Sequence, residues 1–324
     1  MFSSVRLAYL VLMSLCFAAL LTPATAADYP SRTIKVVVPS SAGGTTDLIA
    51  RLICARLAPL LGQSMVIENR IGANGVVGED YLSRQKPDGY TIMFVPSGHA
   101  INNSVYKNIS YDPEKDFTPI ILINTVPMAV VVRPGLKVDS MAGLIELARD
   151  KPGSVTFGSG GIGSSNQLAT ELFATDLGLK LTHVPFNGDA PTINALLGEQ
   201  IDFAFINVPA VLPLIQGKSL RVLAVSSAGP VPSLPGVPSV AASVVGYQAG
   251  SWHAVFGPAK LPTNVVETLN RGMQQVLDMP DVRSRIIAMG IVPMGGSPQD
   301  LAGFLHSEIA KWAKIATEAH VTAE

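Results

Sequence analysis

Cysteine is scarce in this chain of 324 residues, which contains only Cys16 and Cys54. Cys16 lies in an N-terminal segment that we expect to be removed, so Cys54 has no partner for an intramolecular disulfide. Apolar residues accompany Cys54 at helical spacing, which predicts a buried packing residue rather than a nucleophile. The stability of the fold must therefore come from its core.

Charged side chains are also few and nearly balanced. They make up 15% of the residues, and the formal net charge is −1. Removal of Arg6 with the N-terminal segment reduces 23 basic residues to 22, against 24 acidic ones, for a net charge of −2. No strongly charged partner is implied, and we expect no binding to nucleic acid.

Histidine provides little evidence for a metal site. The five residues are widely scattered, with no pair at the spacing of metal ligands, so we expect neither a metal nor another cofactor. His99 follows the end of a predicted strand, and both a ligand contact and simple loop packing remain open for it. His183 lies within a predicted strand and is expected to be an interior residue.

The N-terminal segment has the pattern of a secretory signal peptide. Arg6 precedes an apolar run over residues 7–21, and Ala24-Thr25-Ala26 supplies the small residues that signal peptidase requires. We predict a signal peptide over residues 1–26, cleaved after Ala26, and export of the remainder. A membrane anchor is the alternative, but the run is short for a spanning helix and ends in Thr22-Pro23.

The remaining chain of about 300 residues is long enough for two domains. Apolar strand-like runs alternate with helical patterns, which is typical of βαβ units, so we predict an α/β fold. Val126-Pro127 and the stretch from Gln248 to Ser251 are candidate crossings. They divide the chain into domain 1, residues 27–126 plus 251–324, and domain 2, residues 127–250. The predicted strands are 34–38, 65–68, 90–95, 120–124, 129–133, 155–157, 182–184, 203–206, 222–225 and 248–256.

Two loops of similar design suggest a ligand cleft between these domains. Each follows a predicted strand, is rich in Gly, Ser and Thr, and opens a helix whose first backbone N–H groups lack intrahelical acceptors. Such a helix start favours an anion, most simply a carboxylate. The candidate contacts in the first loop are Ser40, Ser41, Gly43, Gly44, Thr45, Thr46 and Asp47, and those in the second are Ser159, Gly163, Ser164 and Ser165. Asp47 has an alternative role in capping the helix start.

The loops contain no Arg or Lys, which favours a mono- or dicarboxylate held by dipoles over a tricarboxylate. Arg51 and Arg70 are the nearest cations that could enter the site.

Seven ordered segments resemble the receptors of tripartite tricarboxylate transporters, the Bug family. They span nearly the whole exported chain and are residues 28–39, 42–47, 66–72, 87–91, 111–117, 184–188 and 234–238. The resemblance implies a monomeric periplasmic binding protein of the type II fold, which closes over a small carboxylate and delivers it to membrane permease subunits. It also implies that the two loops hold one carboxylate, partly through ordered water.

The same resemblance adds the turn Ser97-Gly98-His99 to the site, and Phe186-Asn187-Gly188 and Asn207 to its far wall. One position departs from the family pattern. Ser40 and Ser41 follow Pro39, where many members carry an aromatic residue, so ligand identity cannot be transferred from relatives that bind aromatic compounds.

Three other functions have to be compared with a transport receptor. The segment Gly158-Ser-Gly-Gly-Ile-Gly163 fits the dinucleotide-binding pattern, but the next strand lacks the acidic residue that a ribose needs. A hydrolase could use Ser159 or Ser164 with His183 and Asp202, yet neither serine lies in a nucleophile elbow, so we expect no enzyme. A periplasmic sensor would use the same binding chemistry, and the sequence leaves that alternative open.

Overall fold

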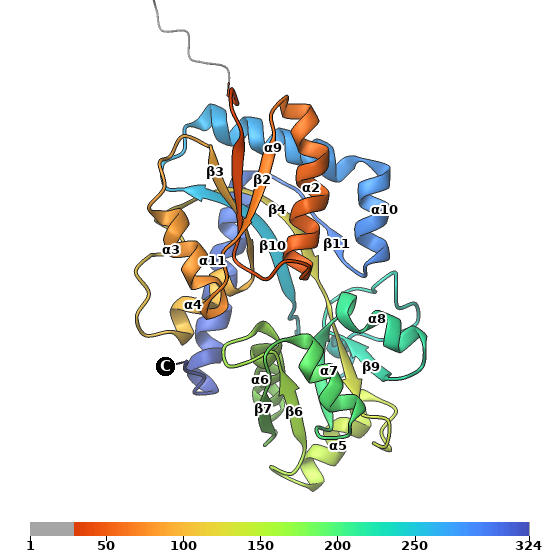
Figure 1. The fold of residues 1–324 in the computed structure, drawn as a ribbon. Helices are drawn as coiled ribbons and strands as arrows, with labels where there is room; N and C mark the ends of the chain where they lie inside the picture. The colour runs from red at the N-terminus through yellow and green to blue at the C-terminus, as the bar shows by residue number, and fades with distance from the viewer. Residues whose placement is uncertain (1–28, 324) are drawn as a thin grey trace, which may run out of the picture.

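The computed structural model describes residues 29–323 and divides them between two mixed sheets in two α/β domains (Figure 1). The first sheet has the order β11-β4-β10-β3-β1-β2. Strand β1 pairs in parallel with β2 and β3, whereas β10 runs antiparallel to β3 and β4. Its strands are β1 (Ile34–Val38), β2 (Met65–Asn69), β3 (Thr91–Pro96), β4 (Phe117–Val126), β10 (Ser251–Pro258) and β11 (Val292–Pro293).

The second sheet has the order β7-β6-β8-β5-β9. Strand β6 is parallel to β7 and β8, and β5 is antiparallel to β8 and β9. Its strands are β5 (Met128–Val132), β6 (Thr156–Ser159), β7 (Thr182–Pro185), β8 (Phe203–Asn207) and β9 (Arg221–Val225). The prediction of an α/β fold with two domains is thereby confirmed.

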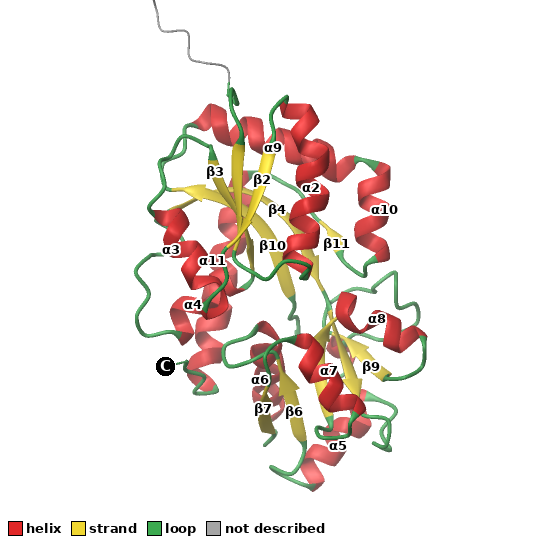
Figure 2. Cartoon of the chain, in the orientation of Figure 1, coloured by secondary structure: helices red, strands yellow, loops and turns green. Residues whose placement is uncertain are grey.

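Helices cover the faces of both sheets (Figure 2). In the first domain they are α2 (Thr45–Leu61), η1 (Ala73–Gly75), α3 (Val76–Ser83), α4 (Gly98–Val105), α9 (Thr263–Asp278), α10 (Pro280–Ala288) and α11 (Pro298–Glu318). In the second they are α5 (Met141–Asp150), α6 (Ser165–Leu177), α7 (Asp189–Leu197), α8 (Val208–Gln216) and η2 (Val240–Ala242).

Helix α2 illustrates how local sequence sets an element that positions the site. Its buried side chains recur at helical spacing and include Ile49, Ile53 and Leu57, which pack on the first sheet. Gly62 ends the helix in the left-handed conformation, with φ of 65°, and its N–H bonds to Ala58 O. Cys54 is buried on the same face, and burial raises the pKa of its thiol to about 12, so its prediction as a packing residue is confirmed.

Two helices depart from the sequence prediction. We expected a turn at residues 97–99, but α4 starts at Gly98, and its weak helix formers Gly98, Asn102 and Asn103 hid the pattern. Helix α8 was not assigned from the sequence, and it contains Pro209 and Pro213. Pro209 lies in the first turn, where the lost N–H has no intrahelical partner anyway.

The chain crosses between the sheets at two adjacent places. Pro127 alone separates the end of β4 from the start of β5, and β10 begins beside it, with Ser251 paired to Val126 (Figure 1). These crossings agree with the candidate positions, while the domain limits of residues 126/127 and 250/251 stay a prediction.

The predicted signal peptide lies outside the described residues. Among residues 29–323, no helix is long and apolar enough to cross a membrane.

Candidate functional site

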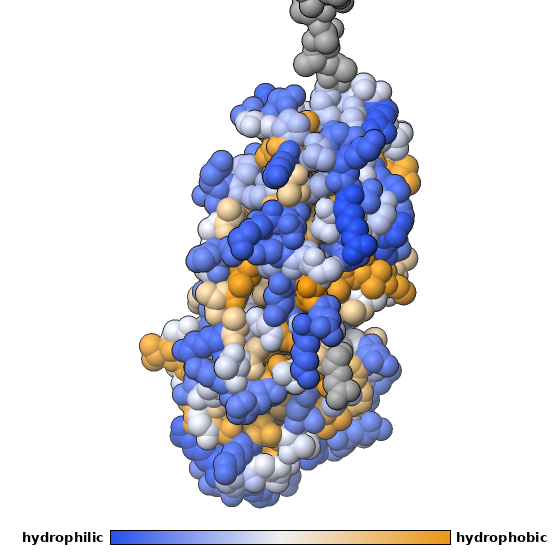
Figure 3. Space-filling model, turned by 90° about the vertical axis from the view of Figure 1, so that its left-hand side faces the viewer, coloured by the Kyte–Doolittle hydropathy of each residue, from blue (hydrophilic) through white to orange (hydrophobic). Residues whose placement is uncertain are grey.

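A cavity of about 320 Å³ lies between the two domains. The space-filling view shows hydrophobic side chains gathered at the level where the domains meet (Figure 3), but the cavity itself is lined mainly by small polar residues. The first domain contributes Ser40, Thr45, Thr46, Asn74, Pro96, Ser97, Gly98, Val126, Ser251 and His253. The second contributes Gly160, Ser164, Ser165, Asn166, Gly188, Asp189 and Asn207.

Five helix starts meet at this cavity. Thr45, Gly98, Ser165 and Asp189 are the first residues of α2, α4, α6 and α7, and Asn207 precedes the first residue of α8. Each start carries partial positive charge from the helix dipole. Within the described chain, no Arg or Lys lines the cavity, so its attraction for anions comes from dipoles and N–H groups.

Helix α2 leaves the most donors free. The first intrahelical bond runs from Leu48 N–H to Gly44 O at 2.9 Å, and Gly44 has no side chain that could cap the helix. The N–H groups of Thr45, Thr46 and Asp47 therefore have no intrahelical acceptor. Ser40 Oγ, at the same end of the cavity, is buried with no hydrogen-bond partner among the described residues. These groups can bind a carboxylate.

Asp47 lies behind this loop rather than in the lining. Its carboxylate accepts hydrogen bonds from Arg51 Nε at 2.8 Å, Gly43 N at 2.9 Å and Asn69 Nδ2 at 3.0 Å. The Arg51 guanidinium, with these N–H donors, lowers the pKa of Asp47 to about 2. Asp47 thus fixes the loop, and its ion pair with Arg51 holds that guanidinium away from the cavity. Arg70 bonds to Glu68 and stacks on Tyr81, so neither arginine lines the cavity.

Substitution Asp47→Asn should lower the free energy of unfolding by about 1–3 kcal/mol at pH 7, since it removes charge-assisted hydrogen bonds. A depressed folded-state pKa stabilises the wild type above pH 3.8, and that contribution disappears as the pH falls through about 2. The two proteins should therefore converge in acid when urea unfolding is compared at pH 7 and near pH 2. The control is Asp281→Asn, which breaks an exposed ion pair with Arg56 and should change the free energy of unfolding by less than about 1 kcal/mol. An equal difference in unfolding free energy between wild type and Asp47→Asn at both pH values would contradict the role given to the Asp47 charge.

His253 reaches the cavity from β10. It is buried, and burial lowers the pKa of its imidazole to about 4, so it is neutral. Nδ1 lies 2.8 Å from Asn124 Oδ1 and donates to it, which leaves Nε2 to accept from the Thr46 hydroxyl at 3.1 Å. The Thr46 side chain is therefore held against His253, and the Thr46 contribution to a carboxylate comes from its backbone N–H.

The second loop is held by its own hydrogen bonds. Ser164 Oγ donates to Gly161 O at 2.6 Å and accepts from Gln167 N at 3.4 Å, so it caps α6. A side chain at Gly163 would come within 2.7 Å of Val105 Cγ1, which shows how closely this loop approaches α4 of the first domain. Ser159 Oγ lies 2.6 Å from His183 Nε2 and outside the lining.

Ser164→Ala should lower the free energy of unfolding by about 0.5–2 kcal/mol, because it removes a helix cap. Affinity of the folded protein for a verified ligand should change less than threefold. Thermal unfolding and calorimetry on one preparation separate the two effects; Ser164→Thr, which keeps a hydroxyl, is the control. A tenfold loss of affinity at unchanged melting temperature would show instead that the hydroxyl contacts the ligand.

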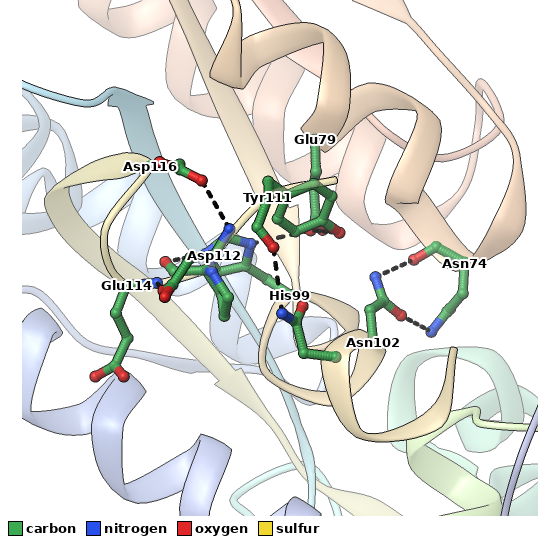
Figure 4. A network of polar contacts seen from close by, with 10 residues as sticks. Asn74, Glu79, His99, Asn102, Tyr111, Asp112, Glu114 and Asp116 are labelled. Atoms are coloured by element: carbon green, nitrogen blue, oxygen red, sulfur yellow. Dashed lines mark hydrogen bonds and ion pairs between the residues drawn. The ribbon is translucent and has the colours of Figure 1, made fainter. Parts of the chain in front are cut away.

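His99 takes part in packing behind α4 (Figure 4). Its side chain is fully buried, with Nδ1 3.1 Å from Glu79 Oε2 and Nε2 3.2 Å from Pro113 O. Tyr111 OH also donates to Glu79. The same close-up shows Asn102 bonded to Asn74, and Asn74 also lines the cavity. Of the two roles left open for His99, the structure shows packing.

The structure therefore brings part of the predicted set together. The predicted residues in the lining are Ser40, Thr45, Thr46, Ser97, Ser164, Ser165 and Asn207. Those outside it are Ser41, Gly43, Gly44, Asp47, His99, Ser159, Gly163, Phe186 and Asn187. Phe186 packs on the core of the second domain, and the Asn187 side chain is exposed. Gly188, which the resemblance placed on the far wall beside them, lines the cavity, as does Gly98 of the predicted turn.

Sequence reasoning missed Asn74, Asp189, Ser251 and His253, whereas Asn166 belongs to the loop 159–166 that it placed at the site. Asp189 lies at a helix start, and the helix-start signal would have found it if it had been applied to side chains as well as to backbone. Asp189 accepts hydrogen bonds from Asn166 Nδ2 at 2.7 Å and Asn207 Nδ2 at 3.0 Å. Burial raises the pKa of Asp189, and these two amide donors oppose the rise.

The residues considered for a hydrolase do not form a triad. Although Ser159 bonds to His183, the Asp202 carboxylate bonds to Arg133 and Thr156. His183 has its pKa lowered to about 4 by burial and stacks on Phe157. The described residues also contain no cluster of His, Cys, Asp and Glu able to hold a metal ion.

Comparison with known proteins gives a consistent result. The family model described as tripartite tricarboxylate transporter family receptor matches residues 49–321. The structure of Rpa4515 from R. palustris with adipate is 40% identical, with a TM-score of 0.83 over 91% of this chain and 99% of that one. The periplasmic binding protein BugD is 31% identical, with a TM-score of 0.79 over 91% and 100%. MatC from Rhodopseudomonas palustris with bound malate is 29% identical, with a TM-score of 0.77 over 89% and 99%.

Proposed function

Because this chain belongs to the tripartite tricarboxylate transporter receptor family, and is therefore a solute-binding protein rather than an enzyme, we propose that it captures a small carboxylate in the cavity between its domains. The observation that carries this proposal is the start of α2, with three N–H groups free of intrahelical acceptors beside the unpartnered Ser40 hydroxyl. Adipate and malate, the ligands of two similar proteins, belong to the same chemical class.

The carboxylate binds to the N–H groups of α2 in the first domain and to the start of α6 in the second. Ser165 and Asn166 supply backbone donors there, because Ser164 caps only the Gln167 N–H. Ser97 and Ser251 add hydroxyls, with their Oγ atoms 2.9 Å apart. Since donors from both domains converge on one anion, binding favours the closed arrangement.

The protein acts in the periplasm after removal of residues 1–26, and it delivers its ligand as a monomer to the permease subunits of a tripartite tricarboxylate transporter. The kinship with the periplasmic binding protein BugD and the N-terminal export pattern support this location. N-terminal sequencing of periplasmic extract tests the cleavage after Ala26. Co-purification with the permease subunits of such a transporter tests the partner and separates transport from sensing.

Calorimetric titration of the purified protein with mono- and dicarboxylates of three to six carbons tests the proposed function. At least one such acid should bind with a dissociation constant below about 100 μM, and binding should raise the melting temperature by mass action. Failure of every acid to bind the folded protein would contradict the proposal.

Ligand binding should also close the cleft by rotation about the two crossings near Pro127 and Gly250, since hinges are a few residues that absorb changes in dihedral angle. Small-angle scattering should then give a smaller radius of gyration with a saturating ligand than without one. The control is an equal concentration of an acid that gives no heat in calorimetry. Superimposable curves with and without the bound ligand would argue against closure.

A further inference from the structure

Asp189 is the single charged side chain in the lining of the described cavity. It is the first residue of α7, and each of its two carboxylate oxygens already accepts one hydrogen bond from the protein. Asn166 Nδ2 donates to Oδ1 at 2.7 Å, and Asn207 Nδ2 donates to Oδ2 at 3.0 Å. A carboxylate offers about four acceptor sites, so two remain for a further donor.

Asn207 adds an acceptor beside this carboxylate. Its Nδ2 atom is directed to Asp189, which fixes the orientation of the amide. Its Oδ1 atom is buried and has no hydrogen-bond partner among the described residues. A buried carbonyl oxygen without a donor is costly, and a donor on a ligand in this cavity would satisfy it.

The charges around the site determine which donor suits it. Among residues 29–323 no cation lines the cavity, and the other titratable group in this lining, His253, is neutral because burial lowers its pKa to about 4. Burial raises the pKa of Asp189, whereas the amides of Asn166 and Asn207 and the start of α7 favour its ionised form. A second ligand carboxylate at this position would meet a like charge, whereas a cationic donor would compensate a partly buried negative charge.

We propose that Asp189 and Asn207 form an acceptor subsite on the second domain that binds the protonated amine of the ligand. The ligand carboxylate binds to the start of α2 on the opposite wall. The preferred ligands are therefore aminocarboxylates, zwitterions whose two charges match the two walls. This assignment rests on the proposed function of the cavity as a carboxylate site and specifies its substrate class.

Matched ligand pairs test the subsite, because each pair differs by one ammonium group on the same carbon skeleton. The pairs are butyrate with 4-aminobutyrate, succinate with aspartate, and adipate with 2-aminoadipate. Calorimetry at pH 7 on the wild type should show at least tenfold tighter binding of the amino member in one pair or more. This comparison needs no variant and stands even if substitutions disturb folding.

Two variants then locate the effect. Asp189→Asn keeps the size of the side chain and removes its charge, so the preference for the amino member should fall at least tenfold while the unaminated acid binds as well as before or better. The matched control is Asp176→Asn on α6, a carboxylate outside the cavity whose pKa is also raised by burial, and it should leave the preference unchanged.

The outcomes separate the subsite from the function of the cavity. If butyrate, succinate or adipate binds and the amine gives no advantage, or if Asp189→Asn keeps the wild-type preference, the subsite is wrong and the carboxylate site stands. If neither member of any pair binds the folded wild type, both assignments are wrong.

Discussion

Thr45→Pro is expected to weaken binding of a verified carboxylate ligand by about 10- to 100-fold with the fold intact, because it removes one N–H donor from the start of α2. Thr45 is the first residue of the helix, where proline is tolerated since that N–H has no intrahelical acceptor. Gly44 before it is extended, with φ of −71° and ψ of 165°, a conformation that a following proline favours. The substitution therefore removes a hydrogen bond to the ligand and none within the protein.

The control is Thr45→Ala, which loses the same hydroxyl but keeps the N–H. The affinity of Thr45→Ala should stay within about fivefold of the wild type, since a neutral hydrogen bond contributes about 1 kcal/mol. Calorimetry gives both affinities, and circular dichroism with thermal unfolding verifies that each variant is folded. Equal affinities for Thr45→Pro and Thr45→Ala would mean that this N–H does not contact the ligand, and the carboxylate would have to be placed elsewhere.

Glu308→Ala is expected to lower the free energy of unfolding by about 3–5 kcal/mol, the largest stability change that we predict. Glu308 on α11 accepts hydrogen bonds at 2.9 Å from the indole N–H groups of both Trp252 and Trp312. Both indoles are almost completely buried, with exposures of 1% and 0%. Truncation would leave two buried donors without an acceptor next to the chain crossing at Ser251.

The conservative variant Glu308→Gln keeps a carbonyl oxygen at this position, so it should cost less than half as much as Glu308→Ala. Urea unfolding monitored by circular dichroism measures both losses, and Glu318→Ala near the exposed end of α11 serves as the matched control, with a change within about 0.5 kcal/mol. Equal losses for the alanine and glutamine variants would show that side-chain packing, not the acceptor, gives Glu308 its effect.

The helix starts could be predicted from the sequence because they depend on neighbours in the chain. A buried strand followed by small residues and then a helical pattern identified the loops at 40–47 and 159–166, and five of the contacts chosen there, Ser40, Thr45, Thr46, Ser164 and Ser165, line the cavity. The direction of each side chain could not be predicted in the same way. Asp47 faces Arg51 and Asn69, and His99 faces Glu79, because packing behind each helix start decides where its side chains lie.

The residues that sequence reasoning missed are brought in by pairing over long distances along the chain. Strand β10 inserts between β3 and β4, so Ser251 pairs with Val126 and His253 reaches Thr46 across 207 positions. No pattern around residue 253 contains that information.

The sequence by itself determined the alternation of strands and helices, the family, the absence of a disulfide in the exported chain and the two anion-binding helix starts, because each depends on composition or on residues near one another in the chain. The tertiary structure alone decided that Asp189 and Asn207 stand in the wall facing the start of α2 and that His253 holds the Thr46 hydroxyl. These contacts arise from strand order, register and the joining of two domains, which depend on the summed burial of side chains across the whole molecule.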